Sequence, residues 1–201
     1  MSDWEQHYQE GFMPWDKGAP SPPLEDWLEK SKDEMEGEIL VPGCGLGHDV
    51  RLLAGRTKAS VVGLDLSSRA IEQAQSVEKS GSEVYVVDDL FALPKDWSGR
   101  FDWVWEHTCF CAIDPELRDG YVTAMHEVLT SEGQLLGVFY LDPYDEDHRP
   151  GERPPHGCTE EELRTRFVES GKFEWVESGI PEKTYPGREG RELLVHLRRV
   201  S

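Results

Sequence analysis

A glycine-rich turn between two apolar segments is the part of this sequence best suited to hold a ligand. The apolar residues 39–41 lead into Gly43-Cys44-Gly45-Leu46-Gly47, and a second apolar run, residues 61–64, ends in Asp65. This order predicts a strand, a glycine turn, a helix, a second strand and then a carboxylate. Glycines let the backbone approach a ligand, and a carboxylate about 20 residues further on takes ribose hydroxyls. The pattern therefore predicts a site for an adenosine-containing cofactor.

The glycine spacing and the start of the predicted helix favour S-adenosylmethionine (SAM) over a dinucleotide. Dinucleotide sites favour G-x-G-x-x-G with a phosphate at the helix N-terminus. Here the spacing is G-x-G-x-G, and His48 and Asp49 follow it. An acidic helix start suits a cationic ligand better than a pyrophosphate, and the sulfonium and amino group of SAM are positive. We therefore expect SAM and no nicotinamide.

Carboxylates also follow the third predicted strand, residues 83–87. The ligand of a doubly wound sheet lies beyond the C-terminal ends of its strands. Asp89, with Asp88 as the second candidate, is therefore predicted to accept a hydrogen bond from the adenine amino group. The apolar neighbour Leu90 is placed to pack on the adenine ring.

The fourth predicted strand, residues 101–105, leads into Glu106 and His107, where the methyl acceptor should meet the sulfonium. Glu106 has two interpretations: it binds the amino group of SAM, or it pairs locally. His107 is either a group of the acceptor site or a polar core residue, since a single histidine proves little. The sequence shows no carboxylate–histidine pair that identifies itself as a general base.

The composition restricts the classes of partner. The chain has 201 residues, a length that predicts one domain, and a net charge of −19 from 40 acidic and 21 basic side chains. This charge argues against nucleic acid or an anionic membrane, because phosphate binding needs clustered Lys and Arg. No apolar run is long enough to cross a membrane, and the acidic N-terminus shows no signal peptide. We expect a cytoplasmic monomer that acts on a small molecule.

The four cysteines match no C-x-x-C zinc or redox pattern. We expect reduced, buried side chains and no metal. Two alternatives stay open at this point: oxidation sensing, and a soft thiolate site built from Cys109, Cys111, His156 and Cys158.

Strands that alternate with helices predict an α/β fold with a mostly parallel sheet. The expected strands are residues 38–41, 60–64, 83–87, 101–105 and 134–140, followed by an antiparallel pair at 173–176 and 192–199. The expected helices are residues 24–34, 47–54, 67–79 (with Ser67 as its cap and Gly81 just past its end), 115–129 and 159–170. A closing antiparallel hairpin fits the seven-stranded Rossmann-like architecture of class I SAM-dependent methyltransferases. In the single domain 1–201, residues 1–36 form an aromatic N-terminal cap and the proline-rich residues 142–158 form a lid loop.

Several segments resemble the thiopurine S-methyltransferase family, and most closely its halide and thiol methyltransferase branch, known in plants as "harmless to ozone layer" proteins. The most specific are residues 14–18, 41–50 and 110–115, and the resemblance spans nearly the whole chain. It implies SAM-dependent methyl transfer to sulfur, halide or a related soft nucleophile. The chain departs from this branch at Tyr8, at residues 107–109 and at His156.

The resemblance also implies roles for single residues. Trp4 and Trp15 would cover SAM from the N-terminal segment. Gly43 and Gly45, with Cys44 between them, would approach its methionine part. Asp65, followed by Leu66, would bind the ribose, and Asp89 with Leu90 would bind the adenine.

The chemistry of a soft acceptor places few demands on the protein. A thiolate, thiocyanate, bisulfide or halide is already a nucleophile, so alignment and exclusion of water are the main requirements. A neutral thiol needs partial ionisation, for which His107 and His156 are the candidates. The rings of Trp15 and Tyr140 are expected to stabilise the sulfonium by cation–π contact. The alternatives are a metalloid methyltransferase that uses the cysteines and a SAM-binding protein without chemistry.

Overall fold

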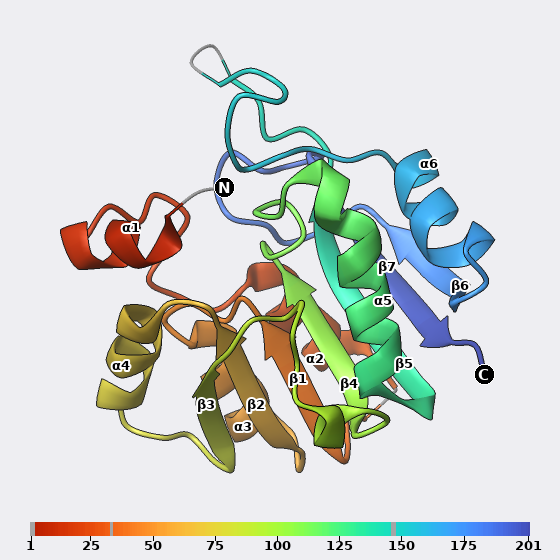
Figure 1. Ribbon diagram of the computed structural model, residues 1–201, viewed down its shortest axis with the longest axis horizontal. Coiled ribbons are helices and arrows are strands. Elements are labelled where there is room, and N and C mark those ends of the chain that lie inside the picture. The colour runs from red at the N-terminus through yellow and green to blue at the C-terminus, as the bar shows by residue number, and fades with distance from the viewer. Residues whose placement is uncertain (1–2, 33, 146–147) are drawn as a thin grey trace.

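A seven-stranded sheet organises the protein in the computed structural model, which describes residues 3–32, 34–145 and 148–201 (Figure 1). The strand order is β3-β2-β1-β4-β5-β7-β6. The first five strands pair in parallel, and β7 pairs antiparallel with both β5 and β6. The sheet is therefore mostly parallel with an antiparallel closing hairpin, as predicted. The strands are β1 (Glu38–Pro42), β2 (Ser60–Asp65), β3 (Glu83–Val87), β4 (Phe101–His107), β5 (Leu129–Tyr140), β6 (Phe173–Gly179) and β7 (Glu192–Arg199).

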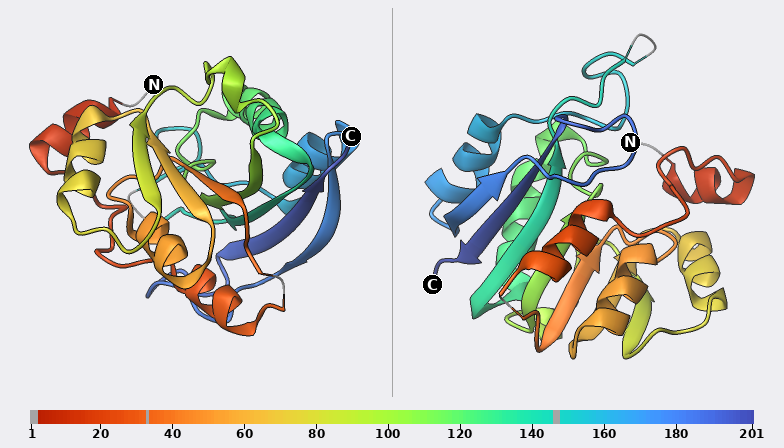
Figure 2. Two further views of the ribbon diagram at one scale, coloured as in Figure 1. Left: turned by 90° about the horizontal axis from the view of Figure 1, so that it is seen from below. Right: turned by 180° about the vertical axis from the view of Figure 1, so that it is seen from behind.

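Helices cover both faces of this sheet (Figure 2). One face carries α2 (Pro22–Lys30), α3 (His48–Arg56) and α4 (Ser68–Ser76). The other carries α5 (Arg118–Val128) and α6 (Glu160–Leu163), which continues as the π-helix η3 (Arg164–Glu169). The remaining helical segments are α1 (Trp4–Glu10) and the 3₁₀ turns η1 (Lys95–Trp97) and η2 (Pro115–Leu117).

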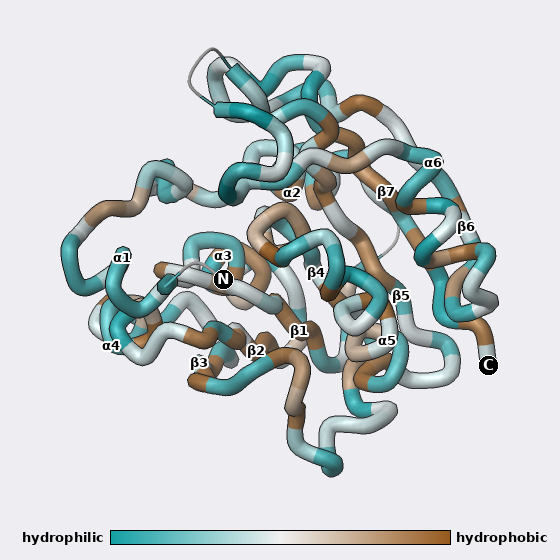
Figure 3. The backbone as a smooth tube through the Cα atoms, turned by 45° about the horizontal axis from the view of Figure 1, so that its top comes forward, coloured by the Kyte–Doolittle hydropathy of each residue, from teal (hydrophilic) through white to brown (hydrophobic). Residues whose placement is uncertain are grey.

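Two hydrophobic cores hold these layers together, one on each face of the sheet. Apolar side chains of α2, α3 and α4 pack on one set of strand residues, and those of α5 and η3 pack on the alternate set. Leu40 and Val41, neighbours on β1, belong to different cores, because successive side chains of a strand point to opposite faces. Figure 3 shows the hydrophobic colour along the central strands and the hydrophilic colour on peripheral segments.

Two predicted helices end earlier than expected, and one helix was not predicted. The helix expected over residues 24–34 is α2, which begins at Pro22 and ends at Lys30. The helix expected over residues 67–79 ends at Ser76, so Gly81 is not its C-terminal cap. A Cβ atom on Gly81 would lie 2.3 Å from the carbonyl oxygen of Ala54, so the glycine permits close packing against α3. Helix α1 was not predicted, although Asp3 accepts a hydrogen bond from the amide of Gln6, which is a helix-capping pattern.

The switch point of the sheet lies between β1 and β4, where ligands of open α/β sheets bind. Figure 1 shows α1 and the link after β5 at the end of the sheet to which the parallel strands point. Helix α1 lies within residues 1–36 and the link after β5 contains residues 142–158, and their functions as a cap and a lid stay predictions; residues 1–2, 33 and 146–147 lie outside the described part. No helix among the described residues is long and apolar enough to cross a membrane.

Candidate active site

The glycine turn after β1 has a conformation and a packing that favour glycine. Gly43, Gly45 and Gly47 have φ angles of 60°, 51° and 74°, in the left-handed region that side chains disfavour. A Cβ atom on Gly45 would also lie 2.9 Å from the hydroxyl oxygen of Tyr8. The turn therefore passes close under the N-terminal segment.

Asp65, at the end of β2, bonds directly to this turn. Its Oδ2 accepts a hydrogen bond from the amide of Gly45 at 2.8 Å, and its Oδ1 accepts one from the amide of Ser67 at 2.9 Å. Burial raises the pKa of Asp65, although the backbone amides act in the opposite direction. A carboxylate has about four acceptor positions, so both oxygens retain capacity for a ribose diol.

The predicted adenine residues follow β2 and β3 on the same side of the site. Leu66 is 56% exposed and Phe91 is 44% exposed, which is unusual for large apolar side chains next to a buried core. Asp88 accepts a hydrogen bond from the amide of Asp89, and Asp89 accepts one from the amide of Phe91. Asp89 is exposed and Leu90 is half-buried. This apolar rim with an exposed carboxylate suits an adenine ring, and Phe91 was not among the predicted residues.

Aromatic side chains of the N-terminal segment cluster over the glycine turn. The rings of Trp4 and Trp15 meet edge-on, with their centroids 5.2 Å apart. The indole N–H of Trp15 donates to the hydroxyl of Tyr8 at 3.2 Å, and Tyr8 is buried against Gly45. Sequence reasoning noted Tyr8 only as a departure from the related branch, but it joins both tryptophans to the cofactor side.

Glu5 attaches α1 to the start of α4. Its carboxylate accepts hydrogen bonds from the hydroxyls of Ser67 and Ser68 and from the amide of Arg69, at 2.7, 3.1 and 3.2 Å. These bonds, with that of Ser67 the strongest influence, lower the pKa of Glu5 to about 2. The attachment lies next to Leu66, so it holds α1 beside the predicted cofactor site.

Of the two interpretations of Glu106, the structure favours local pairing. Its carboxylate is fully buried and accepts hydrogen bonds from the amides of Cys109 and Phe110 and from the hydroxyl of Tyr121. These donors shape the turn after β4. A side chain with no exposed surface has no route to the amino group of SAM unless this turn opens.

His107 forms the carboxylate–histidine pair that the sequence did not reveal. Its Nδ1 lies 3.1 Å from Oδ2 of Asp49, which also accepts a hydrogen bond from the indole N–H of Trp105 at 2.8 Å. Burial alone would raise the pKa of Asp49. The hydrogen bond and the charge of His107, together with the hydrogen bonds from Ser21 and Trp105, outweigh burial and lower the pKa. Asp49 therefore faces the acceptor side, and not the cofactor as its place at a helix start suggested.

The second ring nitrogen of His107 is free. Its Nε2 is buried and has no hydrogen-bond partner within the described part of the chain. The imidazole stacks on Tyr185, with the ring centroids 6.1 Å apart. An unpaired acceptor in a buried position is costly unless a ligand uses it, so Nε2 marks a position for a substrate group.

Residues 16–21, which we call the strap, cross the acceptor side and are held at three points. Asp16 lies 3.1 Å from Nε2 of His48 on α3. The carbonyl of Ala19 accepts a hydrogen bond from the hydroxyl of Tyr185 at 2.7 Å. The amide of Ser21 donates to Oδ1 of Asp49 at 2.6 Å. The strap thus contacts both partners of His107.

The ring of Tyr140, which was predicted to contact the sulfonium of SAM, contacts two arginine side chains instead. The guanidinium of Arg188 lies 4.8 Å from the centre of its ring, and that of Arg191 lies 5.9 Å away. Arg188 also lies 5.4 Å from the ring of Tyr185 and pairs with the buried carboxylate of Glu192. A sulfonium on Tyr140 would meet like charge, so the arginines argue against that role and for an anion nearby.

His156 lies behind this site on the loop before α6. Its amide donates to the carbonyl of Cys111 at 2.7 Å, and its own carbonyl accepts a hydrogen bond from Arg118. Burial, followed by the charge of Arg118, lowers the pKa of His156, which keeps the imidazole neutral near pH 7. Among the described residues His156 makes no hydrogen bond or ring contact with His107, so the two predicted histidines do not form a pair.

The cysteines do not form the soft thiolate site that was left open. Burial is the largest influence on Cys109, Cys111 and Cys158, and it raises the pKa of each thiol, to about 12 for the latter two. Protonated thiols are poor ligands for a soft metalloid. Among the described residues, no three His, Cys, Asp or Glu side chains are grouped so that they could hold a metal ion.

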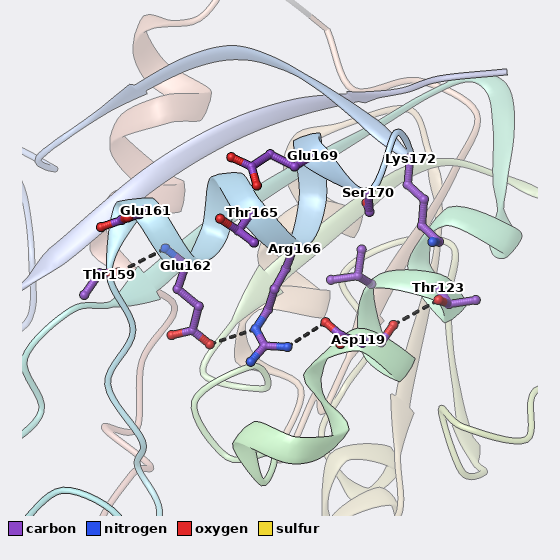
Figure 4. A pocket seen from close by; sticks show the side chains of 11 residues that line it. Asp119, Thr123, Thr159, Glu161, Glu162, Thr165, Arg166, Glu169, Ser170 and Lys172 are labelled. Atoms are coloured by element: carbon purple, nitrogen blue, oxygen red, sulfur yellow. Dashed lines mark hydrogen bonds and ion pairs between the residues drawn. The ribbon is translucent and has the colours of Figure 1, made fainter.

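A polar groove of about 850 Å³ lies elsewhere, between α5 and η3 (Figure 4). Its most prominent charge, Arg166, already pairs with Asp119 and Glu162. None of the predicted site residues lines it. The groove is therefore not the predicted cofactor or acceptor site.

Comparisons with known proteins agree with this architecture. The family model "Thiopurine S-methyltransferase (TPMT)" matches residues 1–181. Thiocyanate methyltransferase 1 of Brassica oleracea is 35% identical, with 98% of this chain and 85% of the relative covered. Thiopurine S-methyltransferase of Acinetobacter baylyi is 25% identical, with 83% of each covered.

Among solved structures, a Burkholderia thailandensis 1,6-didemethyltoxoflavin-N1-methyltransferase with bound S-adenosylhomocysteine has a TM-score of 0.68 and 18% identity, with 99% of this chain and 86% of that chain covered. A SAM-dependent methyltransferase from Methanosarcina mazei has a TM-score of 0.69 and 19% identity, with 84% and 94% covered. These likenesses support the class I methyltransferase fold. With the family match over most of its length, the chain belongs to the thiopurine S-methyltransferase family of enzymes.

Proposed function

We propose that this enzyme transfers the methyl group of SAM to a small, soft nucleophile: a thiol, bisulfide, thiocyanate or halide. We further propose that it acts in the cytoplasm as a monomer, without a nucleic-acid or membrane partner, in keeping with its net charge of −19. The observation that carries the acceptor assignment is the Asp49–His107 pair beside Arg188 and Tyr185.

The residues of the cofactor side fit SAM. A bulkier residue at Gly45 would close the space between the turn and Tyr8. Asp65 is placed to bind the ribose, while Leu66 and Phe91 leave exposed apolar surface for the adenine. Trp4 and Trp15 cover this side, and their π faces suit a cation. When bound, SAM supplies an electrophilic methyl group on a positively charged sulfur.

The acceptor side combines a proton acceptor with a positive charge. Arg188 attracts an anion. Its Nη1 donates a hydrogen bond to Glu192, and its guanidinium also contacts the rings of Tyr140 and Tyr185. The ring of Tyr185 contacts both the imidazole of His107 and the guanidinium of Arg188. The relatives from Brassica oleracea and Arabidopsis thaliana are named for thiocyanate, a soft anion that fits such an environment.

The two kinds of acceptor use these residues differently. A thiocyanate or halide ion brings its own lone pair and needs only to be held in line and shielded from water. A neutral thiol must lose its proton, which Nε2 of His107 would accept. The thiol sulfur would take the methyl group as the bond from that methyl to the sulfonium breaks, and the former sulfonium sulfur would leave as a neutral thioether. The carboxylate of Asp49 then stabilises the imidazolium. The Asp49–His107 pair therefore supports thiols as acceptors more strongly than the sequence alone did.

The test is a panel of acceptors with the purified enzyme and labelled SAM. Iodide, bromide, thiocyanate, bisulfide, thiophenol and a thiopurine are the expected substrates, and arsenite, an amine and an alcohol are the contrasts. The pH–rate profile should be nearly flat for thiocyanate and should rise toward the acceptor pKa for thiophenol. If an amine or alcohol is methylated faster than every sulfur and halide compound, the acceptor assignment is wrong.

The variant His107→Gln separates the two routes. With an alkanethiol, which is neutral near pH 7, it should lower the rate by about 10²-fold, the usual contribution of a general base, and it should change the rate with thiocyanate far less. The control His126→Gln alters a histidine that bonds the carbonyl of Val200, far from the site, and should change neither rate.

A further inference from the structure

We propose that Asp49 is a positioning residue that determines which ring nitrogen of His107 carries the proton and couples that choice to the closed strap. This inference rests on the proposed function, in which Nε2 of His107 receives the acceptor proton. It gives Asp49 a task at the acceptor, although the residue lies in the glycine-rich segment of the cofactor side.

Three N–H groups converge on the two carboxylate oxygens of Asp49. The amide of Ser21 donates to Oδ1 at 2.6 Å, while Trp105 Nε1 and His107 Nδ1 lie 2.8 and 3.1 Å from Oδ2. The side chains of Asp49 and His107 are each only 12% exposed, and Trp105 is fully buried. Water therefore has little access to replace any of these bonds.

The carboxylate selects the tautomer of His107. An ionised carboxylate only accepts hydrogen bonds, so the contact with Asp49 places the proton on Nδ1. The lone pair of the neutral ring then lies on Nε2, the atom without a partner in the described part of the chain. Without this constraint, the proton could sit on Nε2 and block that nitrogen as a base.

The strap shares this carboxylate. Ser21 is fully buried at the N-cap position of α2, where its side chain makes no capping hydrogen bond. It is also the last residue of the strap, so its amide links the strap to Asp49. Loss of the Ser21 bond would free Oδ1 and allow the carboxylate to rotate away from His107. The contact between Asp16 and His48 also holds the strap, but it does not touch His107. The two effects can therefore be separated by mutation.

The variant Asp49→Asn can keep the hydrogen bond from Ser21 or the one from Nδ1 of His107, but not both. An amide has one accepting oxygen and one donating nitrogen. If its oxygen faces Trp105 and His107, its NH₂ group meets the Ser21 amide and repels the strap. If it is reversed, its NH₂ group faces His107, and the proton moves to Nε2.

Two measurements on the full chain, neither of which needs methyl transfer, follow these links. Imidazole ¹⁵N NMR, with the His107 signals identified by His107→Gln, reports the tautomer. The rate of tryptic cleavage after Lys17, which is exposed within the strap, reports strap opening. The native enzyme should show the Nδ1–H tautomer and slow cleavage. The Asp49→Asn variant should show either the Nε2–H tautomer or cleavage about tenfold faster.

Matched variants separate coupling from a general loss of a carboxylate. Asp26→Asn removes a carboxylate that is also 12% exposed but pairs with Lys30 and Lys183; it should change neither readout. Asp16→Asn should speed cleavage and keep the tautomer. Should Asp49→Asn fail to fold, Ser21→Pro removes the amide donor, at a φ of −62° that proline accepts, together with a hydroxyl that has no hydrogen-bond partner among the described residues. It should speed cleavage and also populate the Nε2–H tautomer.

The proposal is overturned if the native enzyme shows the Nε2–H tautomer, if Asp49→Asn keeps both native readouts, or if Ser21→Pro leaves cleavage unchanged. These outcomes differ from failure of the proposed function. If no soft nucleophile is methylated but tautomer and strap respond as expected, the acceptor assignment is wrong and the coupling stands.

Discussion

The cofactor side and the acceptor side of the site are built in different ways. On the cofactor side, Gly45 and Asp65 meet across only 20 residues, within one strand–turn–helix–strand unit. On the acceptor side, His107 and Asp49 are 58 residues apart, and Ala19 and Tyr185 are 166 residues apart. The glycine turn and Asp65 are thus a local motif, to which Glu5 attaches α1 across 62 residues. The acceptor side has no such local unit and is an assembly of distant segments.

This difference explains how one fold can keep its cofactor and change its acceptor. Substitutions in the strap or in the link between β6 and β7 reach His107 and Arg188 without touching the glycine turn. We therefore expect mutations on the cofactor side to affect all acceptors alike, and those on the acceptor side to discriminate between them.

The largest effect on cofactor binding should come from Asp65→Ala. Loss of a charge-assisted hydrogen bond to the ribose, worth about 1.5–3 kcal/mol, should raise the Kd for SAM at least tenfold, and calorimetry measures it directly. The amides of Gly45 and Ser67 also lose their partner, so the melting temperature should fall by several degrees. An unchanged Kd would mean that Asp65 only shapes the turn.

A selective effect of about tenfold is expected at Arg188. The double variant Arg188→Met, Glu192→Gln removes the pair without leaving Glu192 as an unpaired buried charge. It should raise KM for thiocyanate and leave that for a neutral alkanethiol nearly unchanged. The control Arg100→Met, Glu38→Gln removes a similar pair that also contacts aromatic rings but lies far from the site. Equal losses for both acceptors would contradict an anion site at Arg188.

The contrast between contacts that are local in the sequence and contacts between distant segments also determined how much of the fold and the site could be predicted. The limits of β3 and β7, the antiparallel hairpin and the position of Asp65 follow from local periodicity and spacing, and the structure matches them. The Asp49–His107 pair was missed because only the tertiary fold brings the start of α3 to the end of β4. The π-helix η3 was likewise not predicted, because its pattern differs little from that of an α-helix.

A smaller effect should appear in the acid stability of Asp49→Asn. The folded-state pKa of Asp49 lies below its ordinary value of 3.8, so its carboxylate stabilises the fold fully above that pH. This contribution is lost as the pH falls below 3.8 and through the lowered pKa. Chemical unfolding at a series of pH values between about 5 and 2 should therefore show a shallower loss for Asp49→Asn than for the native enzyme. Parallel curves would indicate that the contacts of Asp49 do not favour its charged form.

The smallest effect is expected from Glu5→Gln, which tests whether the N-terminal helix belongs functionally to the cofactor side. Glu5 is half-buried, and its bonds to Ser67, Ser68 and Arg69 compete with water that reaches part of its side chain. Its replacement should raise the Kd for SAM only about two- to fivefold, in the range of charges at helix ends near the surface. Because the pKa of Glu5 is lowered to about 2, its attachment is complete above its ordinary value of 4.5 and is lost as the pH falls toward 2. Proteolysis of residues 3–15 should become faster in the variant, and the ratio of thiophenol to thiocyanate turnover should stay constant. A change in that ratio would show that α1 also acts on the acceptor, and the division between the two sides would then be wrong.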